Sequence, residues 1–279
     1  IFRSWEDRQL GINNAIKGVR LKYYPSDDVE LTALVGQQRD GFNYTESTIQ
    51  GLNTEISLNQ ILNLKDTDLS IGTSIVNRYQ ENGSNDSIPS NVSAYGGRLN
   101  MYSGNFSLSI EGAIKDPDVI ANENTLVSNR LYDGTALQVD FGYSKKGIGL
   151  NTTFRRLENF NFYSDRLAEG NIYNQKTLSF TPTLSKQQDY LLTNIYVYNS
   201  QPRLVMNSIE KRSGEVGFQN DFYYTFNKDN FLGEYKTKIA FNFSYWSGIE
   251  SSFNEDNSYD VKFIGKGPRY YRDLNLEIK

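Results

Sequence analysis

The chain has 279 residues and a formal net charge of −4, with 22% charged and 14% aromatic residues. It contains neither histidine nor cysteine, which excludes His-dependent catalytic triads, thiolate metal sites and disulfide frameworks. The acidic balance argues against a general nucleic-acid-binding protein, and no apolar run approaches the roughly 18 residues of a membrane helix.

Residues 1–14 are rich in charge and lack a regular pattern, so they are predicted to form a loop or a segment inside a larger structure. From residue 15 onward, apolar and polar residues alternate, which is typical of β-strands with one apolar face. The clearest case is 137–154, where Leu137, Val139 and Phe141 alternate with Gln138 and Asp140 before a tight turn at 144–147. The other predicted strands are about 15–24, 29–36, 48–62, 68–76, 92–102, 106–114, 176–184, 189–198, 214–226, 235–246 and 270–279.

The connections between these strands alternate between short and long. Short polar turns are predicted at 25–28, 65–67, 103–105, 185–188 and 227–230, and long segments at 37–47, 77–91, 115–133, 157–175 and 247–269. Outer-membrane barrels show this sidedness, with tight periplasmic turns and long external loops. The sequence therefore predicts a single all-β domain, an antiparallel transmembrane β-barrel in the outer membrane of a Gram-negative bacterium.

About 13 strands are visible in the pattern. Because a barrel closes without free edges and bacterial single-chain barrels have even strand counts, we expect further strands in a longer chain.

Charged residues on the polar sides of the strands are expected to line the barrel lumen, together with the charged N-terminal segment. The expected lining residues are Arg3, Glu6, Asp7, Arg8, Arg20, Lys22, Glu55, Arg98, Glu111, Asp140 and Lys238, with Glu30 and Glu277 of the same kind. Both signs of charge are present, which suits a water-filled lumen and indicates no ion preference. An ordinary salt-bridged loop remains the alternative for the N-terminal cluster.

Aromatic residues near the strand ends are expected to form girdles at the membrane interfaces. The candidates are Tyr23, Tyr102, Tyr143, Tyr224, Tyr245 and Trp246. The alternative is that strands enrich Tyr and Phe in any case.

Three loop features are candidate sites. Ser87, within Asp86-Ser87-Ile88, resembles a Bacteroidota O-glycosylation signal. Asp116 and Asp118, and likewise the pair at 255–256, could bind Ca²⁺, but the sequence has no twelve-residue calcium loop, and solvated acidic loops are expected instead. No cofactor is expected.

Residues 3–21, RSWEDRQLGINNAIKGVRL, resemble a segment of an outer-membrane barrel family of the Bacteroidota. The stretches LLTNIYVYNSQP at 191–202 and FIGKGPRYYRDLNLEI at 263–278 are similar to further parts of that family. The resemblance implies a barrel fold and an outer-membrane location, and it implies no established activity.

Function remains open between two main hypotheses. The first is a porin-like barrel that passes small polar solutes, and the second is a non-conducting structural or accessory subunit of a larger outer-membrane complex for secretion or glycan handling. An enzyme is not expected, because histidine is absent and nothing in the spacing selects a catalytic carboxylate pair. The expected partners are the lipid bilayer, lipopolysaccharide and other outer-membrane proteins, without nucleic acid.

Overall fold

A computed structural model describes residues 6–7, 12–13, 16–40, 42–83, 87–122, 125–160, 162–166, 214–229, 231–253, 259–264, 267 and 269–279. The predicted strands at 176–184 and 189–198 lie outside these residues.

One twelve-stranded antiparallel sheet dominates the described part of the chain. Eleven of its strands pair with their neighbours in sequence order, and the short β5 (Asn43–Tyr44) pairs with β4 at its end. The eleven strands are β3 (Ile16–Ser26), β4 (Val29–Asp40), β6 (Thr48–Ser57), β7 (Thr67–Tyr79), β8 (Asn91–Ser103), β9 (Phe106–Asn122), β10 (Thr125–Lys145), β11 (Ile148–Glu158), β12 (Gly214–Thr225), β13 (Lys238–Gly248) and β16 (Arg269–Ile278). The predicted all-β antiparallel class is confirmed.

The remaining elements are small. β1 (Glu6–Asp7) pairs with β2 (Ile12–Asn13), and β14 (Ser251–Phe253) pairs with β15 (Tyr259–Val261). α1 (Phe231–Glu234) is one helical turn between β12 and β13. In the part of the chain that the structure describes, every helix falls short of the length and apolarity that a membrane crossing requires.

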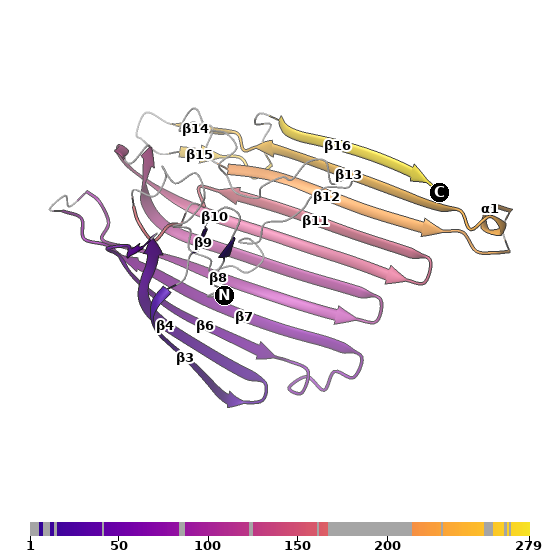
Figure 1. The fold of residues 1–279 in the computed structure, drawn as a ribbon, viewed down its shortest axis with the longest axis horizontal. Helices are drawn as coiled ribbons and strands as arrows, with labels where there is room; N and C mark the ends of the chain where they lie inside the picture. Colours follow the sequence, from indigo (N-terminus) through magenta and orange to yellow (C-terminus); the bar gives the residue numbers. More distant parts are fainter. Residues whose placement is uncertain are drawn as a thin grey trace.

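β3 and β16 form the two edges of the sheet, and each has one hydrogen-bonded neighbour among the described strands. Figure 1 shows the strands side by side in chain order, with the tight turns gathered at one end together with α1. We call this the turn end and the opposite one the loop end. Gly104 and Gly147 form part of two-residue turns at the turn end and have positive φ values of 55° and 86°, which glycine adopts without strain.

Several predicted boundaries were wrong, two of them by five residues or more. Residues 115–133, expected to form a loop, instead continue β9 and β10 as a long hairpin. The apolar–polar alternation fades there because of register shifts between Leu126 and Leu131 and between Tyr132 and Gly134, although strand pairing continues. β6 ends at Ser57 instead of residue 62, so the connection to β7 is longer than the predicted turn.

A compact apolar cluster lies toward the loop end of the sheet. Its buried members are Ile49, Val76, Val92, Ala94, Ala113, Ala136, Leu157 and Phe162. All but Phe162 belong to strands of the main sheet. Phe162 comes from the segment after β11, which therefore packs against the sheet.

Candidate functional site: the polar face of the sheet

The strand register places most of the predicted polar residues on one face of the sheet. Residues directly opposite one another in an antiparallel pair share a face. One continuous row runs through Glu30, Glu55, Gly72, Arg98, Glu111, Gln138, Arg155, Gly217 and Trp246. We call the face that carries this row the polar face and the opposite one the apolar face.

Burial on the two faces is the reverse of that in a water-soluble domain. On the polar face, Gln138 and Arg155 are fully buried at 0% exposure. On the apolar face, Leu21 is 63% exposed, Ile114 59% and Leu276 59%. A contiguous apolar surface of this kind marks contact with a membrane or with another protein.

Glu55 and Arg98 form the central ion pair of the polar face, although β7 lies between their strands. The Nε atom of Arg98 donates to Glu55 Oε1 at 2.9 Å, and its Nη1 atom donates to Ser74 Oγ at 2.8 Å. Gly72 lies between the two charged residues, where an added Cβ would be 2.4 Å from the Glu55 carboxylate and 2.6 Å from the Arg98 guanidinium. The missing side chain at Gly72 therefore leaves the space in which the pair forms.

A second glycine further along the row also leaves space for two side chains to meet across its strand. The Arg155 guanidinium lies 4.6 Å from the centroid of the Trp246 ring, a cation–π contact between β11 and β13. Gly217 of β12 lies between them, and a Cβ there would be 2.5 Å from the indole. Trp246 is fully buried on the polar face, so its predicted place in an aromatic girdle was wrong. The strand period sends it to the side opposite its neighbour Tyr245.

Hydrogen bonds link the remaining polar side chains across the strands. Asp140 accepts from Thr153 Oγ1 at 2.6 Å and from Gln138 Nε2 at 2.8 Å. Asp221 accepts from Asn242 Nδ2 at 2.8 Å and from Gln219 Nε2 at 2.9 Å. These networks fix the carboxylates in place and leave a face that carries both signs of charge.

The other expected lining residues divide into two groups. Arg20, Lys22, Glu111, Asp140 and Lys238 lie on the polar face by register, and Lys22 pairs with Glu30 at 2.6 Å. Glu6 and Asp7 belong to the separate β1–β2 pair, while Arg3 and Arg8 lie outside the described residues.

The girdle candidates also divide. Tyr102 pairs with Asp68 and Ser107, so it lies on the polar face and its girdle assignment was wrong. Tyr23, Tyr143, Tyr224 and Tyr245 lie on the apolar face. For these four, a membrane interface stays a prediction.

A segment that the sequence pattern did not predict to be ordered crosses the polar face at the loop end. Residues 162–166, which we call the strap, follow β11 but bind β7 and its flanking connections. Gln80 Nε2 donates to Asp165 Oδ1 at 3.2 Å, and the Arg166 backbone N–H donates to Gln80 Oε1 at 2.8 Å. Phe162, 2% exposed, anchors the strap in the apolar cluster.

Two arginines fix the strap, one from the sheet and one from the strap itself. Arg78, 1% exposed, pairs with Asp118 at 2.9 Å and donates to the Tyr163 carbonyl at 3.3 Å. Arg166 donates to the backbone carbonyls of residues 80, 81 and 89 at 2.9–3.1 Å. Burial, followed by the neighbouring Arg78, holds the pKa of Arg166 below its usual value. An arginine nevertheless stays charged in a protein, so these hydrogen bonds are charge-assisted.

The acidic loop residues are structural instead of solvated. Asp118 is buried against Arg78, and Asp116 Oδ2 accepts from the Ser93 backbone N–H at 3.0 Å. The expected solvated loop was therefore wrong for these two residues. Residues 255–256 lie outside the described part of the chain, as does Asp86. Ser87 is exposed beside the buried Ile88, and its modification stays a prediction.

Comparison with known proteins gives a family and weak structural likenesses. A model described as "Family of unknown function (DUF6029)" matches residues 1–279. No curated protein sequence matches the chain. The Pseudomonas aeruginosa protein OccK2 (OpdF) is 11% identical, with 99% of this chain and 72% of that chain covered and a TM-score of 0.41. OccK9 (OpdG) of the same organism is 12% identical, with 96% and 66% covered and a TM-score of 0.40. TM-scores this low do not establish a shared fold, and the fold described above rests on the strand pairing itself.

Proposed function

The chain belongs to the DUF6029 family, and we propose that it forms a β-barrel in a bacterial outer membrane and passes small polar solutes along its polar face. In this proposal the apolar face contacts lipid and the polar face lines the lumen. The loop end faces the outside of the cell, as the long connections of outer-membrane barrels do.

The reversed burial of the two faces is the observation that carries the proposal. On β9, the apolar face is formed by Phe106, Leu108, Ile110, Gly112 and Ile114. This stretch of nine residues spans about 27 Å along the strand. Nine residues are also the lower end of the roughly 9–11 that a tilted transmembrane strand needs to cross a bilayer.

The polar face supplies the chemistry that a passage for polar solutes needs. Carboxylates and guanidiniums at its centre are paired or hydrogen-bonded, as in Glu55–Arg98 and Asp140–Thr153. A lining with both charges fixed in place offers hydrogen bonds to many polar solutes without strong attraction for one ion. This supports general passage instead of a catalytic site, and we propose no enzymatic activity.

The strap supports a narrowing of the passage at its outer end. It lies over the polar face, where Phe162 and Arg78 anchor it. In a closed barrel, a segment in that position would reduce the cross-section without interrupting the strands.

The test is single-channel conductance of the full-length protein in planar bilayers, combined with a heat-modifiability gel that reports barrel folding. Stable ohmic steps from a heat-modifiable protein are the expected result. A heat-modifiable protein without conductance would contradict passage and leave the membrane location intact.

The second candidate is a non-conducting accessory subunit of a larger outer-membrane complex, and the strap is the observation that favours it. Its anchors are buried and charge-assisted, which is the arrangement expected of a permanent plug. Partner proteins recovered with the full-length protein from native membranes, without conductance, would support this candidate. Both candidate functions are compatible with a Bacteroidota source and with contact to lipopolysaccharide, and these two points remain predictions.

A further inference from the structure

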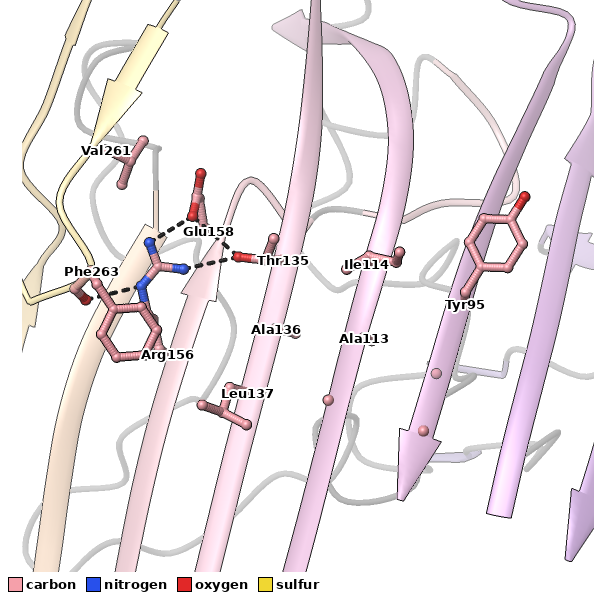
Figure 2. Close-up of a pocket in the computed structure, with 13 residues that line it drawn as sticks. Tyr95, Ala113, Ile114, Thr135, Ala136, Leu137, Arg156, Glu158, Val261 and Phe263 are labelled. Carbon is pink, nitrogen blue, oxygen red and sulfur yellow. Dashed lines mark hydrogen bonds and ion pairs between the residues drawn. The ribbon is translucent and has the colours of Figure 1, made fainter. Parts of the chain in front are cut away.

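A groove with a volume of about 640 Å³ lies on the apolar face toward the loop end. Figure 2 shows its lining, which comes from β8, β9, β10 and β11 of the sheet and, facing them, from Val261 at the end of β15 and Phe263 just after it. Its volume falls in the range of about 300–1,000 Å³ that is typical of ligand sites. None of the predicted lumen or girdle residues forms part of its lining.

Two glycines form the floor of this groove. Gly97 of β8 and Gly112 of β9 are directly opposite each other and lie on the apolar face. Among the described residues, no heavy atom lies within 4 Å of the position that a Cβ on Gly97 would take, and the nearest one to Gly112 is 3.9 Å away. Glycines inside strands weaken a sheet and often mark a place where a ligand approaches the backbone closely. The bare backbone here gives a channel between larger side chains.

The walls of the groove are apolar and accessible. Tyr95 is 40% exposed and Ile114 59% exposed, while Phe263 faces them from the opposite side at 57%. Leu137, directly opposite Gly112, completes the apolar surface. An occupant would therefore be a flexible hydrocarbon in contact with aromatic and aliphatic side chains.

The rim of the groove is polar but carries no free charge. Arg156 pairs with Glu158 at 2.6 Å and donates to Thr135 Oγ1 at 2.9 Å and to the Phe263 carbonyl at 3.0 Å. Because these partners already neutralise and satisfy the guanidinium, the rim offers hydrogen bonds instead of a strong anion site. The groove therefore suits an amphiphile whose apolar chain contacts the walls and whose uncharged or zwitterionic polar part contacts the rim.

We propose that this groove holds one acyl chain of a membrane lipid, with the lipid's polar part at the rim formed by Thr135, Arg156 and Glu158. The inference rests on the proposed function, because it needs the apolar face to lie in lipid. The groove is continuous with the exposed apolar surface of β9, so a bilayer chain can enter it sideways without crossing a polar layer. Its position where the apolar face turns polar places the lipid head at the membrane surface.

The test uses the full-length protein in phosphatidylcholine vesicles that contain a phosphatidylcholine with a diazirine in its acyl chain. After irradiation, the labelled peptides are identified by mass spectrometry. We expect labelling around Gly97, Gly112 and Phe263 to exceed that of the β16 residues Leu274 and Leu276 several-fold. The double variant Gly97→Leu/Gly112→Leu fills the groove and should bring its labelling down to the β16 level.

Thr73→Leu is the matched control, because Thr73 is directly opposite Gly97, exposed on the same face and outside the groove. It should leave the groove labelling unchanged. Phe263→Ser, which removes one wall without touching the sheet, should lower the labelling if the double variant does not fold.

Two results would overturn the proposal, and they differ in meaning. Equal labelling of the groove and β16 would overturn the lipid site alone, because the groove would then hold lipid no better than any lipid-facing strand. Labelling absent from both would overturn the site together with the membrane-spanning function on which it rests.

Discussion

At the scale of single residues, glycine determines which polar side chains meet. Gly72 and Gly217 occupy the same row of the polar face, and each lies between two residues from strands that are not adjacent. Each glycine lets a long side chain reach over its strand, Arg98 toward Glu55 and Arg155 toward Trp246. Each pair of side chains thereby meets across one intervening strand.

Gly72→Val should break the Glu55–Arg98 pair, because the new Cβ would lie 2.4–2.6 Å from both charged groups. Hydrogen bonds to charged groups contribute about 1.5–3 kcal/mol, and the Glu55 carboxylate is partly exposed to solvent, so we expect the free energy of unfolding to fall by no more than that amount in urea titrations of the folded protein. Gly97→Val is the control, since its Cβ enters open space on the other face. Equal losses for both variants would contradict the role of Gly72.

Arg20→Glu tests which face meets the solute. Arg20 lies on the polar face of β3, and Lys17 lies on the apolar face of the same strand. We expect Arg20→Glu to shift ion selectivity toward cations in reversal-potential measurements and to leave folding unchanged. Lys17→Glu makes the same change in charge on the opposite face and should not shift it. The reverse pattern would mean that the faces are assigned wrongly.

At the scale of elements, the strap is the part of the described chain that departs from a simple series of hairpins. It connects residues about 85 positions apart in sequence, such as Gln80 and Asp165. Its hold combines one buried aromatic ring with charge-assisted hydrogen bonds from Arg78 and Arg166. The loss of one anchor should therefore loosen the strap and spare the strands.

Phe162→Ala removes the apolar anchor of the strap. Truncation of a buried phenylalanine costs about 3–5 kcal/mol, which we expect to fall on the contact between the strap and the sheet. The predicted result is a larger single-channel conductance with normal heat-modifiability. Phe226→Ala, the same truncation at the turn end beside Tyr224, should leave conductance unchanged. Unchanged conductance in Phe162→Ala would show that the strap does not narrow the passage.

The sequence predicts those elements whose two faces differ. Residues 106–114 alternate between apolar and polar side chains, and the structure places them in β9 as expected. Residues 115–122 continue the same strand past the apolar surface, where Pro117 and a mixed composition hide the pairing. Strand period thus predicts a strand only where one side meets an apolar environment.

Contacts between residues distant in the sequence could not be predicted from the sequence. The polar identity of Glu55 and Arg98 was clear, but their pairing depends on the register of three strands. The strap carries no period-two signal, and its position depends on long-range contacts with β7. Trp246 illustrates the limit for aromatics, because an aromatic at a strand end fits a girdle equally well on either side of the sheet.

At the scale of the whole molecule, the described sheet buries polar side chains such as Gln138 and Arg155 on one side and exposes apolar ones such as Leu21 and Leu276 on the other. A water-soluble protein would bury the apolar side, since each exposed apolar Å² costs roughly 25 cal/mol. The arrangement is favourable if the apolar side contacts lipid, where only the polar side needs an aqueous environment. The proposed membrane location therefore requires alternate residues along each strand to face lipid and water in turn.

A cysteine scan along β9 tests this claim most directly, because the natural chain has no cysteine. Each position from 106 to 114 is changed in turn to cysteine, spin-labelled and placed in vesicles, and its collision with oxygen and with a water-soluble nickel complex is measured. We predict a period of two, with oxygen favoured at Leu108 and Ile110 and nickel at Ser107 and Ser109. Equal access of nickel to all positions, or a reversed phase, would contradict the account.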